Sequence, residues 1–264
     1  MREAAFRIQR KITESGDQMH DVPTEATPSP QSSAGGTVAP WWHTVMIALL
    51  LVGGSVSSTR AAHHDALAAH HAERYLFGIC AEWALLLLVW WGLRVKRKGF
   101  TGMLGFRRGW QALAEDVGVA AAFWIAALAI LMTIGLLLRA LHLSAPQKTL
   151  MAIAPRTPDE LLLWIGLSLS AGFCEEFVFR GYFLRQFSSM GAGLWLGVAC
   201  SSLLFGVSHG YEGAAGMIAI TAYGALFCVL VFARNSLRPG MIAHVWHDIF
   251  SGIVLALLRH FHPF

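Results

Sequence analysis

The stretch LLLWIGLSLSAGFCEEFVFRGYF, residues 161–183, combines a long apolar run with two adjacent carboxylates and a guanidinium. Charged side chains are costly in a segment that can enter a bilayer, so they mark a functional site by default. On a helix, Glu176 and Arg180 are i,i+4 neighbours that can pair, whereas Glu175 points about 100° away. The spacing therefore predicts one neutralised and one free carboxylate. A buried structural ion pair with a spare glutamate at the interface is the alternative interpretation.

Apolar sequence of this kind extends along most of the chain. Of its 264 residues, 55% are hydrophobic and 14% are charged, and the mean hydropathy is +0.53. This composition predicts an all-α, polytopic integral membrane helical bundle. The net charge of +4 is small and the basic residues cluster beside apolar runs. That pattern indicates contact with the lipid bilayer and not with nucleic acid.

Seven apolar segments are each long enough, or nearly so, to cross a hydrocarbon core of about 30 Å. They lie near residues 41–58, 75–93, 114–138, 160–187, 192–209, 213–233 and 239–258. We therefore expect about seven transmembrane helices. Residues 1–40, rich in Pro, Ser, Thr and Gly, predict a disordered cytosolic tail. The linker 94–113 mixes basic and aromatic residues and is predicted to lie at the membrane interface.

The distribution of basic residues predicts the orientation. With the tail inside, 14 of the 20 Lys and Arg residues fall on the inner side. The positive-inside rule then places the N-terminus in the cytosol and the C-terminus outside. The expected location is a prokaryotic cell (inner) membrane.

Two later segments bring further polar groups into apolar sequence. Phe205 and His209 are i,i+4 at the end of the fifth segment. A histidine in that position is more often interfacial than catalytic. In the seventh segment, one helical face carries His244, His247, Asp248 and Ser251. Such a polar stripe must face a bundle interior or a water-filled cavity.

Together these groups form a hydrolytic set. A carboxylate can act as a general base on water, and imidazoles can stabilise an oxyanion or bind a metal. His209, His244 and Asp248 could supply three ligands to a divalent ion, with zinc as the first choice. A glutamate base with histidine oxyanion donors needs no ion. Both versions remain open.

The three motifs, Glu175-Glu176-Phe177-Val178-Phe179-Arg180, Phe205-Gly206-Val207-Ser208-His209 and His244-Val245-Trp246-His247-Asp248, resemble a known family. It is the intramembrane protease family that groups type II CAAX prenyl endopeptidases with bacteriocin-processing and immunity proteins (CPBP, or Abi). The resemblance covers about residues 158–258, the predicted protease core. Residues 41–157 match only as apolar N-terminal transmembrane helices.

The resemblance implies an intramembrane, CPBP-family (metallo)endopeptidase whose chamber opens to the cytosol and whose substrate is a peptide or membrane protein. It assigns the general base to Glu175, oxyanion or metal contacts to His209 and His244, and a further catalytic contact to Asp248. Glu176, Arg180, Phe205 and His247 would support them. The prenyl-protein enzymes of eukaryotes carry Asn where this chain has Asp248, which argues against a prenylated substrate.

Two other functions are compatible with these residues. Family members linked to bacteriocin immunity or secretion could act as non-catalytic membrane partners, although three complete motifs favour chemistry. A proton-coupled transporter would also use Glu and His in spans, but the sequence lacks the inverted repeats typical of transporters. A histidine cluster at His63, His64, His70 and His71 could bind a metal, and a solvated loop is the simpler interpretation.

Overall fold

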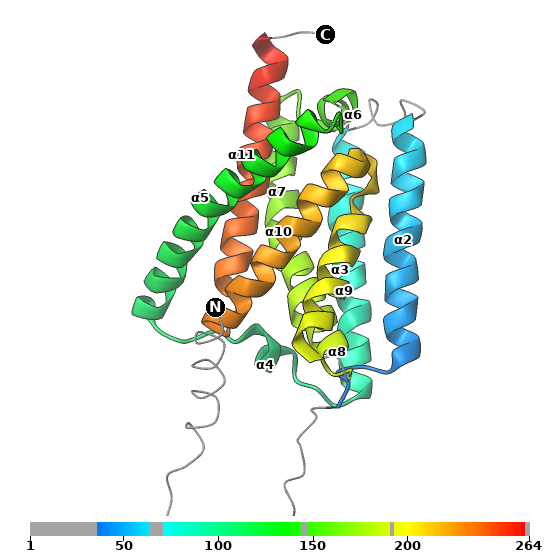
Figure 1. Cartoon of the computed structure of the whole chain (residues 1–264), viewed down its shortest axis with the longest axis vertical. Coiled ribbons are helices and arrows are strands. Elements are labelled where there is room, and N and C mark those ends of the chain that lie inside the picture. Colours follow the sequence, from blue (N-terminus) through cyan, green and yellow to red (C-terminus); the bar gives the residue numbers. More distant parts are fainter. Residues whose placement is uncertain (1–35, 64–70, 144–146, 191–192, 262–264) are drawn as a thin grey trace, which may run out of the picture. The chain divides into compact units, whose positions relative to one another are not determined.

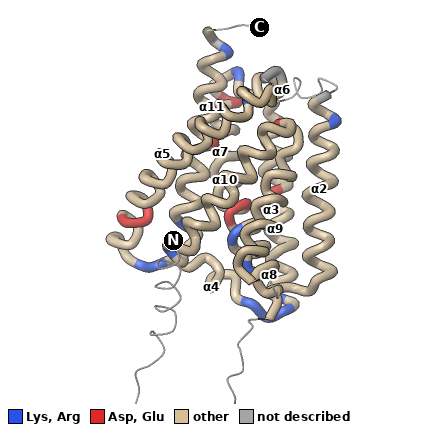
Figure 2. Tube along the Cα trace, viewed as in Figure 1, with Lys and Arg blue, Asp and Glu red and all other residues tan. Residues whose placement is uncertain are grey.

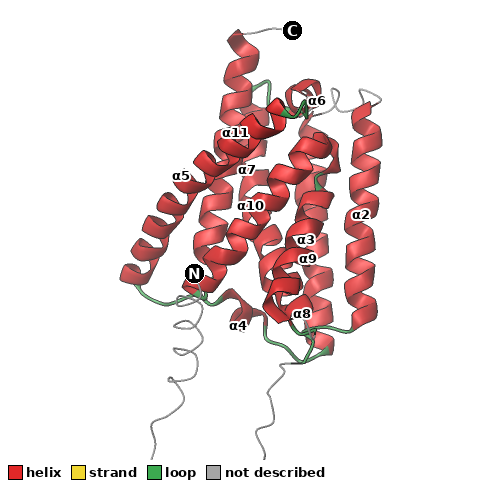
Figure 3. Ribbon diagram, viewed as in Figure 1, coloured by secondary structure: helices red, strands yellow, loops and turns green. Residues whose placement is uncertain are grey.

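The computed structural model describes residues 36–63, 71–143, 147–190 and 193–261, all within the compact unit Gly35–Phe264. The predicted tail up to residue 35, and His64 and His70 of the histidine cluster, lie outside the described residues. In the described part every regular element is a helix, and it holds no strand (Figure 3). The prediction of an all-α fold is confirmed.

Six helical segments of the described part are long and apolar enough to cross a membrane. They are α2 (Trp41–His63), α3 (His71–Val95), α5 (Trp110–Ala140), the run formed by α7 (Pro158–Glu175), η2 (Glu176–Phe183) and α8 (Leu184–Ser188), the run formed by η3 (Gly210–Glu212) and α10 (Gly213–Arg234), and α11 (Arg238–Phe261). The fifth predicted segment forms α9 (Gly193–Ser208), whose 16 residues rise about 24 Å and fall short of the hydrocarbon core. The chain is thus an integral membrane protein with about seven apolar helices, as predicted.

The helices run between two ends of the bundle (Figure 1). The first, called the basic end here, holds the start of α2, the end of α3, α4 (Phe100–Leu104), α8 and the start of α11. The second, called the α6 end, holds α6 (Gln147–Ile153), the start of α7 and the end of α11. Hydrogen bonds tie α6 to this end, because Tyr75 donates to Ile153 O (2.6 Å) and Arg259 donates to Met151 O (3.2 Å).

The start of α7 follows directly from its sequence. Thr157 is the N-cap, and its hydroxyl accepts the Glu160 N–H at 3.2 Å. Pro158 occupies the first helical position, where its missing N–H costs nothing. The Glu160 carboxylate accepts the Arg156 N–H at 2.6 Å. These contacts fix where α7 begins and hence the register of Glu175 further along it.

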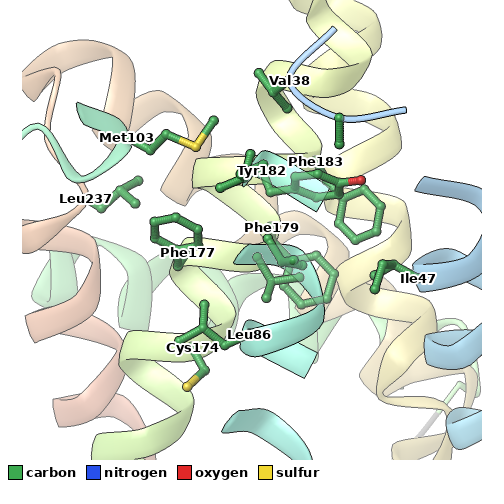
Figure 4. Packing of buried hydrophobic residues seen from close by; sticks show 14 of the residues in the cluster. Val38, Ile47, Leu86, Met103, Cys174, Phe177, Phe179, Tyr182, Phe183 and Leu237 are labelled. Carbon is green, nitrogen blue, oxygen red and sulfur yellow. The ribbon is translucent and has the colours of Figure 1, made fainter. Parts of the chain in front are cut away.

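The α-helix of α7 widens into a π-helix at Glu176. In η2 hydrogen bonds reach back five residues, as in the bond from the Leu184 N–H to Phe179 O. Every residue of η2 is buried, which makes it the most enclosed element of the bundle. Its aromatic side chains pack with residues of α2, α3, α4 and the Leu237 turn (Figure 4): Phe177, Phe179, Tyr182 and Phe183.

The linker 94–113 is in part a packed element. Its helix α4 stacks Phe100 on Phe177 of η2, with ring centroids 4.0 Å apart, and Met103 is buried. The Leu237 N–H donates to Leu104 O at 2.9 Å. Gly105 has a φ of +63° and lies so close to Asn235 O that a Cβ would overlap it. The middle of the predicted interfacial linker therefore packs into the bundle.

Beside this linker, Asp116 of α5 joins three elements. Its fully buried carboxylate accepts from Arg238 Nε at 2.8 Å and from Arg234 Nη2 at 3.0 Å. The neighbouring Glu115 is largely exposed and pairs with Arg107 and Arg234. Asp116 thus links the start of α5 to the end of α10 and the start of α11.

Candidate active site

Three segments far apart in the sequence supply the motif residues. Glu175 ends α7 and Glu176 opens η2, His209 follows α9, and His244 and Asp248 lie on α11. Helix α7 packs against α11, and α9 packs against both η2 and α10. These packing partners bring the three motifs to one place in the bundle.

Glu176 and Arg180 form the predicted i,i+4 ion pair. Arg180 Nη1 lies 3.0 Å from Glu176 Oε1, and both side chains have no exposed surface. The guanidinium carbon lies 4.2 Å from the ring centroid of Phe205 and 4.9 Å from that of Phe227. Aromatic rings cover an arginine favourably because their faces carry negative charge density. The pair is thus sealed between aromatic side chains.

Two glycines let backbone approach this pair. A Cβ on Gly240 would lie 3.2 Å from Glu176 Oε2, and one on Gly224 would lie 3.3 Å from Arg180 Nη2. Both distances are tighter than ordinary van der Waals contact. Helices α10 and α11 therefore approach the pair closely at these two glycines.

His244 connects the ion pair to the second glutamate. Its Nδ1 lies 3.1 Å from Glu176 Oε1 and donates a hydrogen bond, because the carboxylate can only accept. Its Nε2 lies 3.7 Å from Glu175 Oε2 and 3.6 Å from Asp248 Oδ2. Both distances exceed those of direct hydrogen bonds. The carboxylate that orients His244 is thus Glu176, a contact that the sequence did not predict.

Glu175 differs from its neighbour in the way the sequence predicts. Its side chain keeps 21% of its surface exposed, whereas that of Glu176 keeps none. In the described part of the chain, Glu175 pairs with no Arg or Lys, and its ionic contact is with His244. The Glu176 carboxylate is therefore held in a buried ion pair, and the Glu175 carboxylate faces the interior of the bundle with part of its surface accessible.

His209 lies at the end of α9 with one ring nitrogen occupied. Its Nδ1 lies 2.8 Å from Phe205 O and must donate there, because a carbonyl oxygen cannot. The ring of Phe205 contacts both imidazoles, and its centroid lies 5.0 Å from that of His209 and 5.9 Å from that of His244. Nε2 is therefore the nitrogen that each histidine has left for chemistry.

A cavity of about 430 Å³ gathers the candidate residues. Its lining includes these residues named by the sequence: Glu175, Phe205, His209, His244, His247, Asp248 and Ser251. Glu176 and Arg180 do not line it and lie behind His244 and Phe205 instead. The polar stripe predicted on the last span thus faces a cavity.

The cavity is also lined by these polar residues outside the three motifs: Glu82, Ser168, Tyr211, Glu212 and Tyr223. For Glu82, an acid inside the second apolar segment, the sequence allows two positions, the chamber or the outer interface, and the side chain lines the cavity. Tyr211 and Glu212 stand next to His209, so the turn that positions the histidine also positions them. Tyr223, whose ring lies 4.8 Å from that of His247, carries no signal in the sequence.

One indole hydrogen bond links two walls of the cavity, α7 and α11. Trp164 of α7 donates Nε1–H to Asp248 O on α11 at 2.8 Å. Gly252 makes room for this contact, since a Cβ there would overlap the indole. The pairing fixes the carboxylate-bearing turn of α11 against α7.

The predicted metal ligands do not form a ready set. Among the described residues, no three His, Cys, Asp or Glu side chains are grouped so that they could hold an ion. His244 Nε2 and Asp248 Oδ2 lie 3.6 Å apart, and the rings of His209 and His244 both contact the ring of Phe205.

Comparison with known families bears on the same segment. Residues 157–250 match the family model described as "Type II CAAX prenyl endopeptidase Rce1-like". The match covers about a third of the chain, from the N-cap of α7 into α11, and includes all three motifs. It confirms the resemblance drawn from those motifs. No curated protein and no solved structure matches the chain.

Proposed function

We propose, from the similarity of residues 157–250 to the type II CAAX prenyl endopeptidases, that the chain is an intramembrane endopeptidase. It hydrolyses a peptide bond of a peptide or membrane protein with water that Glu175 activates. The reaction centre lies nearer the cytosolic face of a cell membrane, with the N-terminus in the cytosol. The observation that carries the proposal is the difference between two adjacent glutamates: Glu175 faces the cavity, whereas Glu176 is fully buried.

The geometry supports Glu175 as the base. Its carboxylate lines the cavity of about 430 Å³, which has room for water, and in the described part of the chain no guanidinium neutralises it. It takes the proton of the attacking water and passes it to the leaving amine. Asp248, 3.6 Å from His244 Nε2, supplies a further carboxylate facing that nitrogen.

The two histidines have a defined tautomer when neutral. Each carries its proton on Nδ1, so Nε2 presents a lone pair to the cavity. An oxyanion donor needs a proton on Nε2, so that role requires the doubly protonated ring. Ligation of a divalent ion requires the neutral ring. A histidine therefore cannot donate to an oxyanion and ligate a metal ion at the same time. The oxyanion role needs no metal ion and no further ligands.

The proposal is tested by comparing protein termini in cells that carry the wild type, Glu175→Gln or Asp159→Asn. Asp159 is an exposed acid in the first turn of α7 and serves as the matched control. New termini should appear in wild type and control and vanish with Glu175→Gln. A synthetic peptide with that cleavage site, incubated with purified protein in ¹⁸O water, should gain the label at the new carboxylate. Identical termini in all three strains would refute the protease.

If the chain is a non-catalytic membrane partner, the protein termini should be identical in all three strains. Glu175→Gln would then leave the biological effect of the chain unchanged, because binding does not need a base. A proton-coupled transporter predicts that Glu175→Gln abolishes pH-driven uptake into vesicles while no terminus changes. The same pair of variants therefore separates all three functions.

A further inference from the structure

We propose that Ser55 of α2 is a positioning residue for His209 in the hydrolysis, although it lies outside the segment that matches the family model. Its hydroxyl makes two hydrogen bonds to the backbone on either side of the histidine. This backbone, residues 207–210, is called the His209 turn here. The role in hydrolysis rests on the proposed function, whereas the contact between Ser55 and the turn rests on the geometry.

The end of α9 leaves backbone groups to be satisfied from outside the helix. Helix α9 ends at Ser208, and His209 leaves the helical conformation with φ −102° and ψ 30°. The last carbonyls of an α-helix, here including Val207 O, have no N–H of their own helix to accept from. The Gly206 carbonyl accepts the His209 N–H at 3.1 Å, so the Gly210 N–H needs another acceptor. Water does not supply such partners within the hydrocarbon region of a bilayer.

Ser55 satisfies both groups with one hydroxyl. Its Oγ donates to Val207 O at 2.5 Å and accepts the Gly210 N–H at 3.1 Å. A serine can do this because its hydroxyl is a donor and an acceptor at once. Only 7% of the surface of Ser55 is exposed. The two bonds bracket His209, since they hold the backbone before it and the backbone after it.

The close approach of the turn to α2 depends on a glycine. A Cβ on Gly210 would overlap Ser55 Oγ and lie 2.9 Å from Thr59 Oγ1. The Thr59 hydroxyl donates to Ser55 O at 2.8 Å, which holds that side chain in place one turn further along α2. The His209 turn is therefore fitted closely to this part of α2.

Apolar packing between α2 and α9 is incomplete. A second cavity, of about 480 Å³, is lined by both helices, with Val45 and Leu49 from α2 and Leu203 and Val207 from α9. Arg60 is the one Asp, Glu, Lys or Arg of α2 and lies near its end (Figure 2). Apolar contacts have no preferred direction, whereas hydrogen bonds fix distance and angle. The Ser55 bonds are thus the contacts that set the position of the turn against α2.

The position of the turn matters because it carries His209 to the cavity. The Nδ1 of His209 is held by Phe205 O at 2.8 Å, which leaves Nε2 for an oxyanion or an ion. Either role requires Nε2 to stay in place relative to Glu175, and a displacement of about 1 Å can cost 10²-fold in rate. Ser55 does not line the cavity and so acts on the reaction through His209.

The kinetic test compares Ser55→Ala with Ser58→Ala. Ser58 donates to Ser55 O at 2.9 Å within its own helix, so its loss is the same chemical change without a bond to the turn. With the synthetic peptide that carries the cleavage site, Ser55→Ala should lower kcat by about 10–100-fold and leave KM nearly unchanged. Ser58→Ala should behave as the wild type. An unchanged kcat in Ser55→Ala, or a change in KM alone, would overturn the positioning role.

Gly210→Ala disturbs the same contact from the other side, because its new Cβ displaces Ser55 Oγ. It should reproduce the loss of kcat at nearly constant KM. This variant leaves the serine in place, so it decides the question even if Ser55→Ala does not fold. A fully active Gly210→Ala would show that the close contact of the turn with α2 is not needed.

Chemical modification of His209 gives a readout that needs no substrate. Purified full-length wild type, Ser55→Ala and Ser58→Ala are treated in detergent with diethyl pyrocarbonate, which attacks unprotonated imidazole nitrogens. Mass spectrometry follows His209, with the exposed His142 as internal reference. His209 should react several-fold faster in Ser55→Ala and at the wild-type rate in Ser58→Ala; equal rates in all three would overturn the proposal. If the wild type cleaves no peptide, the protease is refuted, and this readout still decides whether Ser55 holds His209.

Discussion

His244 donates its Nδ1–H to Glu176 across 3.1 Å, although 68 positions separate the two residues in the sequence. Glu176 also pairs with Arg180 through the same oxygen. One buried carboxylate therefore orients an imidazole at the cavity and neutralises a guanidinium behind it. The neighbouring Glu175 pairs with no Arg or Lys in the described part of the chain, so its carboxylate is left for the proposed reaction.

The two glutamates should respond differently to the same substitution. Glu175→Gln should abolish cleavage and leave melting in detergent unchanged, because its side chain faces the cavity. Glu176→Gln should lower stability by about 3–5 kcal/mol, because Arg180 is left buried without a counter-charge. Its amide oxygen can still accept from His244, so some activity per folded molecule should remain. Thermal unfolding and peptide cleavage of both variants check this; an active Glu175→Gln enzyme would remove the base.

Adjacent acids at the basic end offer a second matched pair. Asp116→Asn should destabilise the bundle by about 3–5 kcal/mol, because Arg234 and Arg238 lose a buried partner. Glu115→Gln removes the same charge from an exposed site and should have a much smaller effect. Equal melting temperatures for the two variants would show that the Asp116 contacts do not hold α5 to α10 and α11.

Glycine substitutions test the contact between α7 and α11. Gly252→Ala should cost about 1–3 kcal/mol and reduce cleavage, because the new Cβ displaces Trp164 from Asp248 O. Gly118→Ala is the control, since a Cβ there meets nothing within 4 Å. It should stabilise the helix by about 0.5–1 kcal/mol. A harmless Gly252→Ala would mean that the indole does not set the position of Asp248.

Chelation separates the two versions of the chemistry. The melting temperature should not change when divalent ions are removed, because the described residues contain no preformed ligand set. Activity before and after the chelator then decides the role of His209, His244 and Asp248. Full activity in a metal-free preparation would eliminate the metalloprotease, whereas loss that only zinc restores would establish it.

Local spacing predicted what lies within one helix. The Glu176–Arg180 pair follows from i,i+4 spacing and is present at 3.0 Å. The polar stripe from His244 to Ser251 likewise faces one cavity. The Glu176–His244 bond could not be predicted, because it depends on how α11 packs against α7 and on the π-helical widening that begins at Glu176. Apolar length alone also could not tell the short α9 from a full span.

The layer formed by Arg180 and the rings of Phe205 and Phe227 also has an electrical consequence. Hydrolysis needs water deep in the bundle, and a continuous column of water would let protons cross the membrane. Moving one charge through 100 mV is worth about 2.3 kcal/mol, so such a leak would drain any stored gradient. Arg180, Phe205 and Phe227 interrupt that column on the side of the basic end. Water at the proposed reaction centre is therefore separated from the basic end by this layer.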